Sequence, residues 1–125
     1  MSSILFKNAG ILATEGNGFK FIENGYLGVE GKIIDYIGTE EPKKRYKEER
    51  NAKGIILAPG FVNCHGHSAM TLLRGVGSDL PLDDWLHVMW PVEDRMNEDD
   101  LRCGMELAIM EMLSSGTTSF TDMYL

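Results

Sequence analysis

The chain has 125 residues and a mass of 14.0 kDa, the size of one ordinary domain. Hydrophobic residues make up 43% and charged residues 25%, which fits a soluble globular protein and excludes a disordered, collagen-like or coiled-coil chain. With 19 acidic and 12 basic residues, the formal net charge of -7 argues against a nucleic acid or an anionic membrane as partner.

The apolar runs, the first residues and the cysteine count of the sequence bear on its cellular compartment. No run of about 18 apolar residues predicts a membrane span. The first residues lack the cationic and apolar regions of a signal peptide, so we expect a cytoplasmic protein. Two cysteines, Cys64 and Cys103, cannot build a disulfide framework; they leave one bridge or, by default, two reduced thiols.

The first part of the chain, residues 1–57, predicts a small β domain. Apolar and β-branched residues come in short runs that glycine and asparagine turns separate, a pattern typical of an antiparallel sheet. Within residues 4–37 the runs are 4–6, 11–12, 19–22, 26–29 and 33–37, and a further short strand is expected at 55–57. Residues 39–53 are almost wholly polar and predict a solvated loop or a short surface helix, to which we assign no function.

Residues 58–125 predict a βαβ unit. A strand at 61–67 runs into a loop, and residues 68–95 are irregular with one short helix at Leu82–Met89. A helix is expected over 98–115, with Asn97 as its N-cap and an apolar face. That face comprises Leu101, Met105, Ala108, Ile109 and Met112. A strand at 117–124 follows Gly116, and the order strand, helix, strand implies two parallel strands.

His65 and His67 are the candidate metal ligands. Side chains two apart on a strand point to the same face, so two imidazoles can share one cation. A bare His-x-His occurs often by chance. Here the pair follows the first strand of a βαβ unit, and parallel α/β folds build their sites at that end of the strand.

Residues 59–67, PGFVNCHGH, resemble the first-strand metal motif of the amidohydrolase superfamily. Further segments look like the 5-methylthioadenosine/S-adenosylhomocysteine deaminase branch of that superfamily, so the resemblance covers essentially the whole chain. They are MTLLRG at 70–75, DLPLDDWL at 79–86, WPVE at 90–93, EMLSSGTT at 111–118 and DMY at 122–124. Cys64 and Gly66 stand where threonines are usual in the branch.

The resemblance implies a fold and a site. It implies strands of an N-terminal β-sandwich at 1–57, then the first βαβ unit of an incomplete metal-dependent (β/α)8 barrel at 58–125. It implies that His65 and His67 bind zinc and that Glu93 contacts the ribose of a small-molecule nucleoside substrate. It also implies hydrolytic deamination of the adenine ring; the carboxylic acid and histidine that move protons in the family come from later strands, so no catalytic residue is expected here.

Several alternatives stay open at the level of sequence. Glu93 could be a surface carboxylate paired with Arg95, and Trp85 and Trp90 could line a purine pocket or serve as core anchors. Cys64 is expected to pack on the face opposite the histidines, with a zinc thiolate as the alternative. Cys103 is expected to be a small core residue.

The expected barrel also bears on association. A (β/α)8 barrel needs about 250 residues, so we expect the N-terminal piece of a longer enzyme. Such a piece leaves strand edges and apolar faces uncovered, and we expect it to form a homo-oligomer or to associate with the remainder. Guanine deaminase-like or chlorohydrolase-like chemistry, and a non-catalytic module that pairs with another chain, are the alternative functions.

Overall fold

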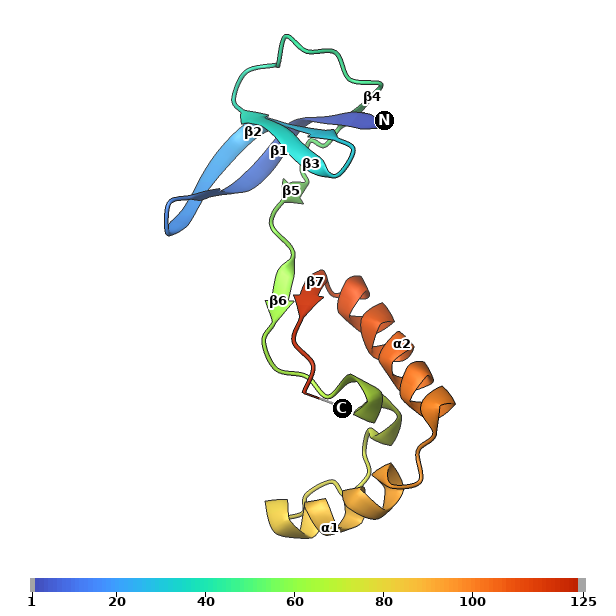
Figure 1. Cartoon of the computed structure of the whole chain (residues 1–125). Helices are drawn as coiled ribbons and strands as arrows, with labels where there is room; N and C mark the ends of the chain where they lie inside the picture. Colours follow the sequence, from blue (N-terminus) through green and yellow to red (C-terminus); the bar gives the residue numbers. More distant parts are fainter. Residues whose placement is uncertain (1, 124–125) are drawn as a thin grey trace. The chain divides into compact units, whose positions relative to one another are not determined.

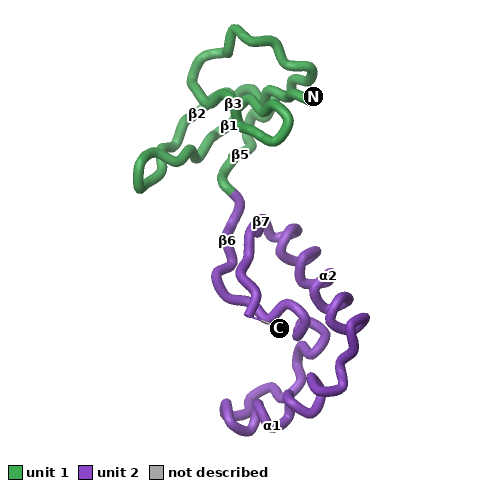
Figure 2. Tube along the Cα trace, in the orientation of Figure 1, with its two compact units in different colours: residues 1–59 green, residues 60–125 purple. Residues whose placement is uncertain are grey.

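The computed structural model describes residues 2–123, and the chain divides into two compact units (Figure 2). The first unit spans residues 1–59 and contains strands, and the second spans residues 60–125 and contains the helices and two further strands (Figure 1). No helix among the described residues is long and apolar enough to cross a membrane.

The first unit is a mixed sheet. Its strands are β1 (Ser3–Glu15), β2 (Gly18–Glu30), β3 (Ile33–Gly38), β4 (Glu48–Asn51) and β5 (Ile56–Leu57). The order is β3-β2-β1-β4, with β5 also on β1. The pairs β1–β2 and β2–β3 are antiparallel, as the sequence predicts, but β4 and β5 run parallel to β1. The antiparallel sheet predicted for residues 4–37 is confirmed, and β4 and β5 join it in parallel because the polar loop after β3 returns the chain alongside β1 in the same direction.

Strands β1 and β2 are longer than the apolar runs suggest. The interruption expected between the runs 4–6 and 11–12 is a bulge within β1, where Asn8 takes a φ of 60° and the pairing register shifts between Phe6 and Ala9. Asn24 lies within β2 with a φ of 52°. Asparagine adopts this left-handed conformation more readily than most residues, so the chain bends without leaving the sheet.

The core of the first unit lies on one face of the sheet. Ala9 and Ile11 of β1 pack with Ala52, and Leu57 and other half-buried side chains surround them. Phe19 remains 65% exposed and Ile33 66% exposed. Within the described residues these strands form a single sheet.

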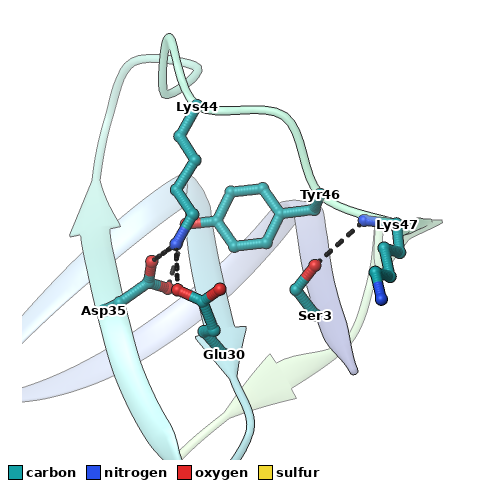
Figure 3. A network of polar contacts seen from close by, with 6 residues as sticks. All are labelled: Ser3, Glu30, Asp35, Lys44, Tyr46 and Lys47. Atoms are coloured by element: carbon teal, nitrogen blue, oxygen red, sulfur yellow. Dashed lines mark hydrogen bonds and ion pairs between the residues drawn. The ribbon is translucent and has the colours of Figure 1, made fainter. Parts of the chain in front are cut away.

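The polar loop between β3 and β4 is anchored by Tyr46, which is buried (Figure 3). Its ring occupies the space that the missing side chain of Gly28 leaves, and its hydroxyl donates a hydrogen bond to Asp35 at 3.0 Å. Lys44 bridges Asp35 and Glu30, with its Nζ 2.5 Å from a carboxylate oxygen of each. The Lys44 ammonium and, to a lesser degree, the Tyr46 hydroxyl hold the pKa of Asp35 below its ordinary value of 3.8.

The second unit contains the parallel pair that the sequence predicts. β6 (Phe61–Asn63) and β7 (Thr117–Phe120) pair in parallel. Between them lie the 3-10 helix η1 (Ser68–Leu73), α1 (Leu82–Glu93) and α2 (Glu98–Ser114). Helix α1 continues past the predicted end at Met89: it includes Pro91, which lacks an amide donor, and ends at Glu93. Tyr124, at the predicted end of the last strand, lies outside the described residues.

Helix α2 begins and ends as the sequence predicts. The Asn97 side chain accepts hydrogen bonds from the amides of Asp99 and Asp100, and the Asp100 carboxylate accepts one from the Asn97 amide. This capping box satisfies amides that have no partner within the helix. Gly116 follows the helix with a φ of +86°, a conformation that glycine adopts without strain.

The buried face of α2 is narrower than its apolar stripe. Gly104 and Ala108 are the buried residues, whereas Met105 and Ile109 are 39% and 36% exposed. A side chain at Gly104 would overlap the backbone of Ala69, so the absence of a side chain lets η1 and α2 approach closely. Cys103 is exposed, and its prediction as a core residue was wrong because it lies beside this narrow contact and not within it.

The Gly104 contact predicts a cost for Gly104→Ala. Alanine favours a helix over glycine by about 1 kcal/mol. The overlap with the Ala69 backbone should outweigh this gain, and we expect the free energy of unfolding to fall by about 1–3 kcal/mol, measured by urea denaturation. Cys103→Ala is the matched control, with a change within about 0.5 kcal/mol. A neutral or stabilising Gly104→Ala would contradict the close contact.

The Lys44 bridge predicts a pH-dependent stability. Because the pKa of Asp35 is lower in the folded chain, the bridge stabilises the fold above the unfolded pKa and loses this effect as the pH falls through the folded pKa. We expect Lys44→Met to lower the unfolding free energy near neutral pH, with the difference from wild type shrinking in acid. Lys43→Met, in the same exposed loop, is the control for urea denaturation at several pH values. A difference independent of pH would contradict the bridge.

Candidate metal centre

His65 and His67 lie together on the loop that follows β6. Their ring centroids are 5.2 Å apart, with an angle of 62° between the ring planes, and both side chains are exposed. Strand β6 ends at Asn63, so the alternation of side chains along a strand does not account for the proximity of the two rings. The conformation of the loop brings them together instead.

Hydrogen bonds from both sides hold this loop. Within it, the His65 amide donates to the Asn63 Oδ1 at 3.2 Å, a side-chain turn that asparagine forms readily. From the segment after β7, the Thr121 amide donates to the Asn63 carbonyl and the Met123 amide donates to the Gly66 carbonyl, both at 2.9 Å. The parallel pairing thus continues past the strands and fixes the backbone on each side of His65.

Asp122 holds the end of the loop. Its carboxylate oxygens lie 3.2 and 3.4 Å from the amide nitrogen of Ser68, which donates to them and directly follows His67. The place of Asp122 at the end of the second strand allows two roles from sequence, facing the site or hydrogen-bonding a loop, because the carboxyl ends of neighbouring parallel strands meet at one edge of a sheet. The structure shows the hydrogen bond to the loop.

The distance between the two ring centroids equals the one that two imidazoles on a single zinc ion would have. A zinc ion lies ~2.0–2.1 Å from an imidazole nitrogen, and therefore about 3.2 Å from the centroid of that ring. Two rings that subtend the tetrahedral angle of about 109° at the ion then have centroids about 5.2 Å apart. Among residues 2–123, no three His, Cys, Asp or Glu side chains could together hold a metal ion. The loop therefore brings together two side chains of a ligand type.

A hollow of about 320 Å³ adjoins the loop. It is lined by His67 and by the polar side chains of Asn63, Ser68, Thr71, Glu111 and Ser115, among others. Arg74 donates hydrogen bonds of 3.0 and 2.6 Å to the two carboxylate oxygens of Glu111 and thereby lowers the pKa of Glu111. Glu111 is thus a carboxylate paired with a guanidinium, and His67, unlike His65, is among the described residues that line the hollow.

Glu93, the candidate substrate residue, is the half-buried last residue of α1. It is not among the described residues that line the hollow beside His67. Cys64 is exposed, so the packing role expected for it was wrong.

The aromatic side chains of α1 lie outside the hollow. Trp85 is half-buried, Trp90 is 51% exposed, and neither is among the described lining residues. His87 lies near Trp90, with ring centroids 5.9 Å apart, and its Nδ1 is 2.6 Å from the Asp83 carbonyl oxygen. His87 is therefore engaged with its own helix.

This chain is similar to known proteins in both sequence and fold. Residues 56–125 match the amidohydrolase family. The 5-methylthioadenosine/S-adenosylhomocysteine deaminases of Syntrophomonas wolfei and Acetivibrio thermocellus are 44% and 42% identical over 97% and 98% of this chain. An adenosine deaminase from Xanthomonas campestris, solved with bound zinc, superposes with a TM-score of 0.83 at 30% identity over 99% of this chain.

The matches cover a limited part of each relative. The chain spans 28% of the Syntrophomonas deaminase, 29% of the Acetivibrio deaminase and 29% of the Xanthomonas structure.

Proposed function

Because the chain belongs to the amidohydrolase family, we propose that it supplies part of a zinc-dependent site that hydrolytically deaminates adenine nucleosides. In that reaction water replaces the amino group at C6 of the adenine ring and ammonia leaves. Relatives over 40% identical that are named as deaminases of adenine nucleosides support this choice of substrate class.

The observation that carries the proposal is the His65–His67 pair. The two imidazoles lie 5.2 Å apart on an exposed loop at the carboxyl end of a parallel strand. Neutral imidazole is a preferred ligand of zinc. The Xanthomonas relative was solved with bound zinc, which favours this metal over others.

His65 and His67 would each donate one nitrogen to the ion and so fix its place at the edge of the sheet. Zinc, when bound there, supplies a Lewis acid that makes water a nucleophile at neutral pH. Two imidazoles complete only half of a tetrahedral shell, so we propose that further ligands and the proton-transferring groups come from outside residues 2–123. The β6–α2–β7 unit would then be the opening unit of a (β/α)8 barrel.

Glu93 would bind the ribose. A carboxylate accepts hydrogen bonds from both hydroxyls of a vicinal diol, and Glu93 is half-buried at the end of α1. This role concerns the orientation of the nucleoside, while the chemistry takes place on the adenine ring.

Association follows from the same proposal. Phe61 and Val62 of β6 are 69% and 64% exposed, although their strand belongs to a parallel pair. Parallel sheets are covered on both faces in α/β folds. We propose that this surface is covered by the rest of the barrel or by a second chain.

The zinc ligands are tested by titration of the metal-free chain with Zn²⁺ against a chromophoric chelator. We expect weak binding, because two ligands hold the ion, and loss of that binding in His65→Ala and in His67→Ala. His87→Ala is the matched control and should bind zinc as wild type does, since His87 is engaged within α1. Wild-type affinity in His65→Ala would remove His65 from the ligand set.

The substrate is tested in a chimera that joins this chain to the remaining length of the Syntrophomonas deaminase. We expect zinc-dependent deamination of 5′-methylthioadenosine, absent when either His65 or His67 is alanine. Glu93→Gln should lower kcat/KM for the nucleoside by roughly 10- to 100-fold, the equivalent of one charge-assisted hydrogen-bonding group, and leave turnover of free adenine unchanged. Turnover of guanine but not of the adenine nucleoside would contradict the proposal.

A further inference from the structure

We propose that Asp122 is a positioning residue, which sets the spacing of the His65–His67 pair by holding the backbone amide that follows His67. The inference deepens the function proposed above and rests on it, because the pair has to be spaced for one zinc ion. Asp122 would act through the loop without binding the metal itself.

Backbone hydrogen bonds on both sides of Asp122 fix its place beside the His65–His67 loop. Its two neighbours, Thr121 and Met123, donate their amides across to the Asn63 and Gly66 carbonyls at 2.9 Å. These two hydrogen bonds align residues 121–123 with the loop, so Asp122 lies at a fixed place along it. From there its carboxylate reaches the Ser68 amide, at 3.2 and 3.4 Å.

The buried amide of Ser68 requires a hydrogen-bond acceptor from outside its own helix. Ser68 is 5% exposed and is the first residue of η1, where an amide has no acceptor within its own helix. The preceding residue, His67, provides no side-chain cap. A carboxylate oxygen from the segment after β7 fills this role.

The hydrogen bond to the Ser68 amide also restrains the backbone of His67. His67 stands immediately before Ser68, and its carbonyl accepts a hydrogen bond from the Met70 amide at 3.0 Å. Fixing the Ser68 amide therefore fixes the C-terminal side of His67, while the Met123 amide fixes Gly66 on the other side. The 5.2 Å spacing of the two rings depends on these restraints, since the loop 64–67 belongs to no helix or strand.

Asp122 is distinct from a third ligand. Both of its oxygens lie within hydrogen-bonding distance of the Ser68 amide, and no group of three ligand-type side chains around a common point exists within residues 2–123. A positioning role requires an acceptor oxygen, whereas a ligand role requires the anionic carboxylate. The amide of asparagine separates the two, because it keeps an acceptor oxygen and loses the charge.

The test compares Asp122→Ala and Asp122→Asn in the whole chain, with Zn²⁺ alone as the probe in a chelator competition. Loss of a residue that orients a ligand costs about 10- to 100-fold in metal affinity. We expect a loss in this range for Asp122→Ala and near wild-type affinity for Asp122→Asn. Asp84→Ala, an exposed aspartate on α1, is the control and should bind as wild type does.

A second readout needs no metal. In the metal-free chain, the NMR cross-peaks between the His65 and His67 ring protons should be present in wild type and Asp122→Asn and lost in Asp122→Ala. Persistence of these cross-peaks in Asp122→Ala would overturn the proposal. Equal loss of zinc in both Asp122 variants would overturn it too, since Asp122 would then act as a ligand.

The two proposals fail in different ways. If His65→Ala binds zinc with wild-type affinity, His65 and His67 are not the proposed ligand pair, whatever the Asp122 variants do. If His65→Ala loses zinc binding and Asp122→Ala does not, the ligand pair stands and the positioning role of Asp122 is wrong.

Discussion

The candidate site depends on the parallel pairing of β6 with β7. The pairing brings together two segments that lie more than 50 residues apart in the sequence, and its hydrogen bonds continue past both strands to Thr121 and Met123. Without this continuation, the loop that carries His65 and His67 would lose the backbone hydrogen bonds that hold it to the segment after β7. The chemistry proposed for the chain is therefore a consequence of strand pairing.

The helices contribute by holding the two strands in place. Helix α2 connects back to β7 through the Gly116 turn, and it packs on η1 through the contact of Gly104 with Ala69. Because η1 begins directly after His67, this contact supports the end of the His65–His67 loop opposite β6. Gly104 and Ala69 thus help to position the loop through close packing, although neither has a polar side chain.

Local patterns of the sequence predicted the parts of the second unit that local interactions decide. Asn97 and Asp100 indicate the start of α2 because a capping box forms among neighbouring residues. The strand–helix–strand order around α2 likewise predicts the parallel pair. The spacing of His65 and His67 singles out two residues that the structure brings together, although loop hydrogen bonds account for their proximity and strand alternation does not.

What the sequence did not reveal depends on partners distant along the chain. Strands β4 and β5 run parallel to β1 because the Tyr46 loop is anchored on β2 and β3, and no local pattern encodes that anchor. Cys103 is exposed because α2 packs through a contact only as wide as Gly104 and Ala108. The role of Asp122 emerges only when Ser68, 54 residues away, is placed beside it.

The most direct measurement is X-ray absorption at the zinc edge of the zinc-loaded chain. We expect scattering from two imidazole nitrogens at ~2.0–2.1 Å from the zinc ion, with oxygen atoms in the remaining coordination positions. A sulfur neighbour at about 2.3 Å would instead assign the exposed thiol of Cys64 to the ion, and a shell of oxygens without imidazole would show that His65 and His67 do not share a zinc ion.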